Sequence, residues 1–277
     1  MRRRSEDTLQ SIDCDVQLAA PMSSWQVSYV AEEIVKHLLF MRNMIPSLFN
    51  DLAEKVQVDQ SSEAGATTER KKLRRPGGQR KVVKFVNKVT ELTSALSLNI
   101  FEMQPCTKLY FVLGPSPLRP LEIYVLSCSA IAHATAEADD RAAAVARDVS
   151  RKVLRSLIIN TAAVPEGNVS TGSTKLFLLL QAPRQEEPPS GFLPKRAFQL
   201  RQRRGLQVQI QLRTPQQGSP TDMRVDATAS SPIEMDQSNE GYSKAMNTED
   251  LVWYQCTTSL KGLTIISSQQ SGIDGFM

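Results

Sequence analysis

The sequence predicts an α+β fold in which long helices cover one face of a mainly antiparallel sheet. Apolar residues recur every three or four positions over three long windows, which is the period of amphipathic helices. Shorter windows alternate apolar and polar residues, or are apolar throughout, as strands are. A chain of 277 residues with 41% apolar content can build one domain with a substantial core.

The helical windows are bounded by clear signals. They are residues 25–44, 81–103 and 137–160. Ser23 or Ser24 can cap the first window. Pro46 and Pro105 follow the first and second windows, and the residue before a proline avoids the α region. The third window has acidic residues at its start and basic residues in its second half, which suits the helix dipole. A short extra helix is expected over 51–56.

The last of the strand windows is the most distinctive. The predicted strands are residues 108–113, 120–127, 173–181, 206–212, 251–255 and, to complete the sheet, 263–266. Residues 251–255, Leu-Val-Trp-Tyr-Gln, are apolar on both faces and are expected to be buried. Roughly forty polar residues precede this strand, so the chain is expected to wrap around its own core before it.

One domain with irregular segments is the expected organisation. Its parts are a disordered arm over 1–22, a single domain over 23–267, and a tail over 268–277. Inside the domain we expect a basic linker over 57–80 and a polar low-complexity loop over 215–248. No secretory signal is expected, and no window approaches the roughly eighteen continuous apolar residues of a membrane span.

Catalytic motifs are absent from the sequence. His37 and His133 have no serine, cysteine or paired carboxylate in a familiar spacing, and an ordinary structural histidine is favoured for each by roughly ten to one. No phosphate-binding glycine motif and no nucleophile elbow occur. The four cysteines lack metal-ligand spacing, so no metal, cofactor or disulfide scaffold is expected. A non-enzymatic role follows.

Positive charge is concentrated in two runs of a chain whose net charge is only +4. Residues 69–88 hold nine Lys or Arg against one Glu, and residues 195–204 hold five Lys or Arg. The first run has the charge to neutralise nucleic-acid phosphates, but residues 71–81 contain no aromatic side chain for base stacking. A solvated linker or nuclear import signal is favoured over nucleic-acid binding by roughly three to one.

The third helical window has an apolar surface wider than one stripe. The apolar set is Val153, Leu154, Leu157 and Ile158, and the basic row beside it is Arg147, Arg151 and Arg155. Apolar residues rimmed by arginine suit a protein partner. Periodicity alone still gives a purely core role about twice the weight of an interface.

Four segments resemble the comet family, in the same order along the chain. They are residues 33–46 of the first helix, the strand and turn over 109–124, the loop Gly191-Phe192-Leu193-Pro194-Lys195, and the C-terminal block 249–263. Each motif is short, but together they span most of the chain. The linkers at 57–78 and 215–248 are unlike those of animal members, so the resemblance is to a divergent, non-animal member.

The resemblance implies a HORMA fold, with three long helices on the sheet and a C-terminal safety-belt segment that wraps to the far edge. Comet proteins bind the closed form of the spindle-checkpoint HORMA protein Mad-two. They present it to a hexameric AAA+ ATPase of the Pch-two type, which opens it, and the mitotic checkpoint is silenced. The client of this chain is then the mitotic protein, a meiotic chromosome-axis HORMA protein, or both.

Site residues follow from the same resemblance. The expected client-binding residues are Met41, Arg151, Leu154, Leu157 and Ile158. Met41 and Leu154 match family interface positions, and the other three are neighbours on the helical face. The expected ATPase-binding residues are Pro194 and Lys195, in the Phe-x-Pro-Lys loop.

Two other functions stay open at this point. One is a basic nucleic-acid or chromatin-binding module that uses residues 69–88, and the other is a hydrolase of unrecognised type. The salt dependence of binding distinguishes a nucleic-acid-binding module from an adaptor, because phosphate contacts weaken steeply as the salt concentration rises. The basic run predicts a nuclear presence, and a checkpoint adaptor also meets partners in the cytoplasm, so both locations are expected.

Overall fold

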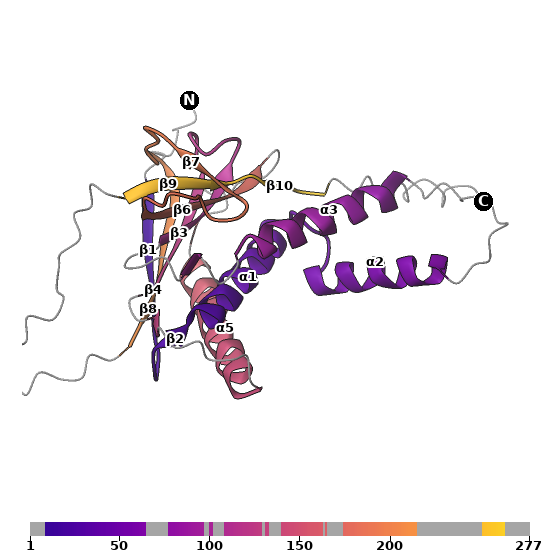
Figure 1. The fold of residues 1–277 in the computed structure, drawn as a ribbon, viewed down its shortest axis with the longest axis horizontal. Helices are drawn as coiled ribbons and strands as arrows, with labels where there is room; N and C mark the ends of the chain where they lie inside the picture. Colours follow the sequence, from indigo (N-terminus) through magenta and orange to yellow (C-terminus); the bar gives the residue numbers. More distant parts are fainter. Residues whose placement is uncertain are drawn as a thin grey trace, which may run out of the picture.

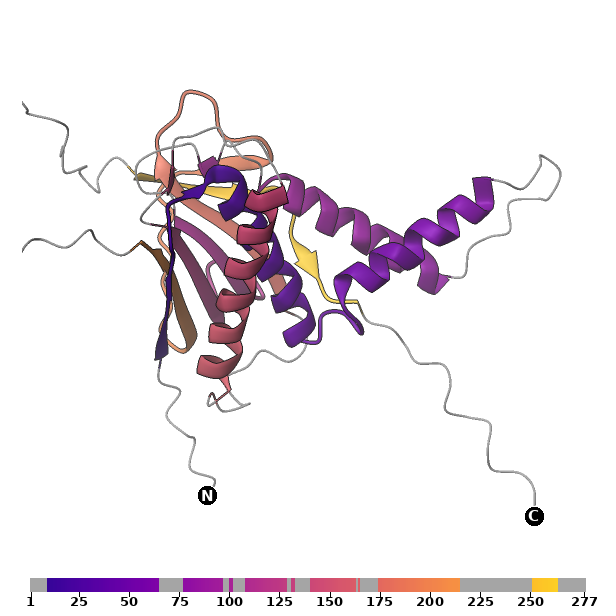
Figure 2. The same ribbon diagram turned by 90° about the horizontal axis from the view of Figure 1, so that it is seen from below.

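A computed structural model of the chain has two layers. It describes residues 9–64, 77–96, 100–101, 108–128, 131–132, 140–162, 164, 174–214 and 251–263. One large sheet forms the first layer, and helices cover one of its faces (Figures 1 and 2). The sheet is mostly antiparallel, so the predicted α+β class is confirmed.

The large sheet has eight strands, seven of them in the order β1-β8-β4-β3-β6-β9-β7, with β10 paired to β6. The bounds are β1 Leu9–Gln17, β3 Lys108–Gly114, β4 Glu122–Cys128, β6 Lys175–Pro183, β7 Phe192–Lys195, β8 Gly205–Arg213, β9 Leu251–Cys256 and β10 Leu260–Lys261. β8 runs parallel to β1 and β4, and the other pairs described in this sheet are antiparallel. A separate parallel pair joins β2 Met22–Ser23 to β5 Ile131–Ala132. The first five predicted strands are confirmed, and residues 264–266 of the sixth lie outside the described residues.

Four long helices are described, one more than predicted. They are α1 Ser24–Met41, α2 Phe49–Ala64, α3 Gly77–Ser94 and α5 Asp140–Thr161. α1 and α5 pack against each other over the sheet (Figure 2). α2 and α3 lie side by side as a helical hairpin that projects away from the sheet in both views (Figures 1 and 2).

β1 corrects the prediction of a disordered arm over residues 1–22. Residues 9–17 pair in parallel with β8 along the whole strand. Cys14 and Val16 face the core and are buried, whereas the side chain between them is exposed. The polar residues that suggested disorder are the outward half of a period-two pattern, which is the pattern of a strand with one wet face.

The predicted basic linker over 57–80 is also corrected, at both of its ends. α2 continues to Ala64, and α3 already begins at Gly77. Leu52 and Val56 of α2 belong to the same buried cluster as Phe85 of α3. Each helix is stabilised by its neighbour, and such tertiary packing extends helices beyond what local composition suggests. Residues 65–76 of this linker lie outside the described residues.

α1 begins and ends with defined caps. The predicted Ser23 cap is confirmed and forms a capping box. At the other end, Asn43 adopts a left-handed φ of 51°, and the Met44 N–H donates to the Leu39 carbonyl at 2.9 Å. These are the features of a Schellman motif, which ends the helix at Met41, before the predicted end at 44.

The face of the large sheet opposite the helices is partly covered by the segment between β7 and β8. Residues 196–204, which we call the strap, connect β7 to β8, and these strands lie toward opposite ends of the sheet order. On this face the Phe198 ring packs edge-on against Trp253 of β9, with 5.5 Å between the ring centroids. The centroid of the Tyr110 ring lies 4.8 Å from that of the same indole. On the helix side of the same strand, Tyr254 is 2% exposed. β9 therefore has apolar contacts on both faces, as its sequence predicts.

A second long connection leads from β8 to β9. The chain leaves β8 at Arg213 and rejoins the sheet at Leu251, on the far side of β4, β3 and β6. Residues 215–250, which include the predicted polar loop, lie outside the described residues.

A buried ion pair joins the end of α1 to the middle of the sheet. Arg42 Nε donates to Glu122 Oε2 at 2.7 Å, and Arg42 Nη2 donates to the Tyr124 hydroxyl at 2.6 Å. That hydroxyl donates in turn to the same carboxylate oxygen at 2.8 Å. The Glu122 side chain is fully buried. Burial, and next the Glu122 charge, raise the pKa of Tyr124, so the hydroxyl keeps its proton and stays a donor.

Removing the arginine should destabilise the fold strongly. We expect Arg42→Met to lower the free energy of unfolding by about 3–5 kcal/mol, because the Glu122 carboxylate loses its cation while it stays buried. Tyr124→Phe removes one hydroxyl and should cost about 1–2 kcal/mol. Urea unfolding followed by circular dichroism measures both changes, and equal small losses would contradict this role of the ion pair.

Candidate partner-binding site

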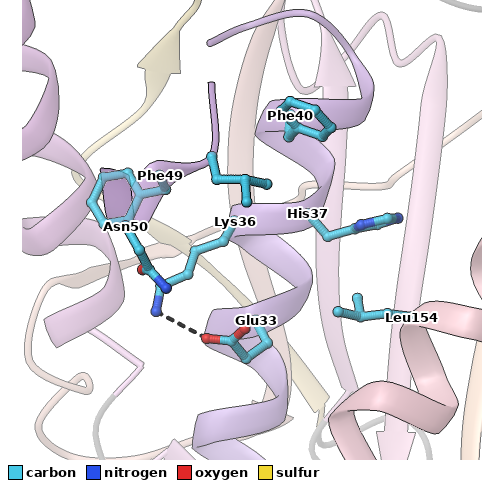
Figure 3. A pocket seen from close by; sticks show the side chains of 8 residues that line it. Glu33, Lys36, His37, Phe40, Phe49, Asn50 and Leu154 are labelled. Atoms are coloured by element: carbon cyan, nitrogen blue, oxygen red, sulfur yellow. Dashed lines mark hydrogen bonds and ion pairs between the residues drawn. The ribbon is translucent and has the colours of Figure 1, made fainter. Parts of the chain in front are cut away.

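A hollow of about 190 Å³ opens between α1, the start of α2 and α5. Its lining residues are Glu33, Lys36, His37 and Phe40 of α1, Leu48, Phe49 and Asn50 at the α1–α2 junction, and Leu154 of α5. In Figure 3, His37 and Leu154 extend into the space between α1 and α5, and Phe49 and Asn50 lie on the α2 side. Three elements thus contribute to one concave surface.

Local structure explains why these side chains meet. Glu33, His37 and Phe40 recur at i, i+4 and i+7, so they share one face of α1. That face turns away from the stripe that includes Ile34 and Leu38, which is buried in the core. The Schellman motif then reverses the chain, and α2 begins beside the same face of α1.

Apolar side chains in and beside the hollow are exposed. Phe40 is 40% exposed, Met41 38%, Leu48 56% and Ile158 47%. Leu154 lines the hollow from α5, is half-buried and packs against the core. A single exposed apolar residue is ordinary, but a set from three elements around one hollow is typical of a protein interface.

The Lys36 cation in the hollow is paired with two carboxylates. Lys36 Nζ lies 2.9 Å from a carboxylate oxygen of Glu32 and 2.9 Å from one of Glu33. Burial opposes the charged form of Lys36, but hydrogen bonds to both carboxylates outweigh burial, so the pKa of Lys36 is raised. The lysine charge in the hollow is therefore paired, and apolar side chains line the same surface.

His37 lines one wall of the hollow and has no nucleophile beside it. Burial lowers its pKa from 6.5, and the charge of Arg42 lowers it further. The imidazole is therefore neutral at physiological pH. No serine, threonine or cysteine lines this hollow. The neutral imidazole of His37 therefore has no hydroxyl or thiol among the lining residues to activate as a nucleophile. The other histidine, His133, lies outside the described residues.

Four of the five residues predicted to bind the client lie on this side of the molecule. Leu154 lines the hollow, and Ile158 follows it one turn later on α5. Arg151 is exposed one turn before Leu154. Met41 ends α1 and directly follows a lining residue. Of these four, Leu154 lines the hollow, and the other three neighbour lining residues along α1 and α5.

Leu157 is not part of this exposed surface, contrary to the prediction. Its side chain is 2% exposed and packs in the core cluster with Val149 and Val153. These three residues recur at i, i+4 and i+8, which makes them the inward stripe of α5. Neighbouring residues on a helix point about 100° apart, so Ile158 is exposed although Leu157 is buried.

Phe40, Leu48 and Phe49 are lining residues that sequence reasoning did not single out. Phe40 had a detectable signal, since it is a large apolar residue outside the main stripe of its helix. Leu48 and Phe49 had none, because the second helix was expected to begin only at 51. Their role depends on how the chain reverses after α1.

The predicted ATPase-binding residues, Pro194 and Lys195, lie on β7 at one end of the sheet. Both are exposed, whereas Phe192 on the same strand is 2% exposed and anchors it. Gly191, which begins this motif, has a φ of 78°, and a Cβ there would lie 2.8 Å from the Ala95 side chain. Gly191 and Phe192 thus hold this loop in place, whereas Pro194 and Lys195 are its exposed residues.

Two classes of site find no support in the described part of the chain. It contains no group of three or more histidine, cysteine, aspartate or glutamate side chains placed to hold a metal ion. None of its helices combines the length and apolar character needed to cross a bilayer.

Comparison with known proteins gives one family match. The p31comet family, described as Mad1 and Cdc20-bound-Mad2 binding, matches residues 4–220. This range covers more than three quarters of the chain and contains all the lining residues of the hollow as well as β7. A search of the curated proteins finds no match.

The lowered pKa of His37 should make the fold sensitive to mild acid. Below about pH 6.5 the unfolded chain takes up a proton on this imidazole more readily than the folded chain, so stability falls as pH drops toward the folded pKa. We expect His37→Gln to lose less thermal stability than the wild type on acidification through this range. Melting temperatures measured in steps of pH test this, and parallel pH profiles would contradict it.

Proposed function

The chain belongs to the p31comet family of Mad2-binding proteins, and from that premise we propose that it is a non-enzymatic adaptor for a remodelling ATPase. It binds the closed form of Mad2 and presents it to a hexameric AAA+ ATPase of the Pch-two type, which opens Mad2 and so silences the mitotic checkpoint. Meiotic chromosome-axis HORMA proteins are further clients in this proposal, and the adaptor works in both nucleus and cytoplasm.

The exposed apolar hollow carries this proposal. Residues from α1, the α1–α2 junction and α5 surround it, and large apolar side chains such as Phe40 and Leu48 are left half-exposed there. A partner helix or loop that covers this surface removes apolar area from water, which is the main driving force of association. Burying a leucine-sized side chain contributes about 1.5–3 kcal/mol.

The two proposed contact surfaces are built on different elements. The hollow lies on the helix layer, whereas Pro194 and Lys195 lie on β7 at the end of the sheet. The surfaces share no residue, so the two partners do not compete for the same side chains. Simultaneous binding is what an adaptor requires, since a shared surface would make the two partners compete.

A mixed α/β domain with a mostly antiparallel sheet is consistent with a HORMA-like fold. We propose that β9 and β10 are the safety-belt segment of this fold. In support, β9 joins the sheet between β6 and β7 after a long connection from β8. Leu263, just after β10, then donates its N–H to the Met44 carbonyl at 2.8 Å, which ties the segment to the end of α1.

A charge placed at Leu154, which lines the hollow, should weaken client binding strongly. We expect Leu154→Glu to weaken binding of closed Mad2 from the same organism by at least about tenfold, since covering a leucine side chain by a partner contributes about 1.5–3 kcal/mol. Isothermal titration calorimetry with both purified proteins measures this. The matched control is Ile159→Glu, on the same helix, because Ile159 is 64% exposed and does not line the hollow. Equal losses in the two variants would exclude the hollow as the contact.

The β7 surface should be needed for remodelling and not for client binding. We expect Pro194→Ala with Lys195→Ala to bind Mad2 with unchanged affinity but to lose stimulation of ATPase-driven Mad2 opening. A control pair, Glu186→Ala with Glu187→Ala, changes exposed residues shortly before the same strand. Normal opening with the first pair would show that the ATPase contacts another part of the adaptor.

A further inference from the structure

The projecting helix α3 carries an exposed row of cations that the adaptor function does not use. The row, which we call the α3 basic row, is Arg80, Lys81, Lys84 and Lys88, and all four are exposed. At about 100° per residue the four side chains fall within one sector of about 100° on the helix surface. The buried stripe with Phe85 and Val89 lies beside this sector and holds α3 to the core.

Among the side chains that the structure describes, the row has no ion-pair partner. The acidic residues Asp51 and Glu54 of the neighbouring α2 are exposed and unpaired with the row, and Glu91 lies at its C-terminal end. The sequence predicted a helix from residue 81, which holds Lys81, Lys84 and Lys88, but it left Arg80 in the linker. The structure begins α3 at Gly77, so all four cations lie on one side of the same helix.

We propose that the α3 basic row binds the phosphate backbone of duplex DNA, without sequence preference. Arg80 and Lys88 are separated by about 12 Å along the helix axis, at a rise of about 1.5 Å per residue. One strand of B-DNA presents a phosphate about every 3.4 Å along its axis, so the row spans about three or four of them. Neutralising these phosphates releases counterions, which is a favourable and salt-dependent contribution.

The composition of α3 favours duplex phosphate over unpaired nucleic-acid bases and over an apolar protein surface. Its single aromatic residue, Phe85, is 5% exposed, so no ring is available to stack on unpaired bases. The exposed residues of α3 are all polar or glycine, whereas protein interfaces centre on apolar or aromatic anchors. The hairpin also projects away from the sheet, so bound DNA would leave β7 and the hollow free (Figures 1 and 2).

The experiment is a DNA titration of the full chain at several salt concentrations. Fluorescence anisotropy of a labelled mixed-sequence duplex of about 20 base pairs gives log K against log[salt]. We expect Arg80→Gln, Lys84→Gln and Lys88→Gln together to reduce the magnitude of this slope by about 2–3 and to weaken binding at least tenfold at low salt, at about 0.9 per lost phosphate contact. Lys84→Gln alone should reduce the slope by about 0.9.

A control variant removes equal charge from another exposed region. Arg196→Gln, Arg201→Gln and Arg203→Gln change the strap, and DNA binding should persist in this variant. No DNA binding by the wild type, or an equal loss in both triple variants, would overturn the proposal. Tighter binding of a poly-glutamate peptide than of DNA to the same row would overturn it in favour of an acidic protein. Mad2 affinity, measured in parallel, should be unchanged in the α3 variant, which separates this test from that of the adaptor function.

Discussion

The Arg42–Glu122 ion pair holds the helix layer to the sheet at the point where α1 ends. Two charges taken out of water are costly, and only good geometry with extra hydrogen bonds compensates for this. Here a tyrosine supplies those bonds, since Tyr124 accepts from the arginine and donates to the carboxylate. Because Arg42 is the residue that caps α1, the same contact fixes where the chain reverses toward α2, and therefore where the hollow has its second wall.

Much of the fold was predictable because most elements carry one strong period. The buried strands β3 and β6 are nearly continuous apolar runs, and β8 alternates without a fault. Prediction failed where stability comes from a neighbour. β1 contributes only a few inward side chains and depends on pairing with β8. α2 has a weak pattern and is helical because it packs on α3.

The candidate site shows the same division at the level of single residues. The resemblance and the helical period correctly placed Leu154 and Ile158 on one side of α5, but they could not separate Ile158 from Leu157, which is a matter of rotation about the helix axis. The place of Leu48 in the hollow could be predicted only from how α1 and α2 are joined. A concave surface that arises from three elements is a tertiary property, and a pattern within one element describes only the wall that this element supplies.

The strand β7 has one described neighbour, β9, although more than fifty residues separate them along the chain. Contacts of such large sequence separation form late, because a long loop must close first. At a synthesis rate of about 5–20 residues per second, several seconds pass between the synthesis of β7 and that of β9, its described partner. The end of the sheet that displays Pro194 and Lys195 is therefore assembled by the last part of the domain to fold. An unfinished chain would already have its helices and most of its strands, but it would lack this end of the sheet.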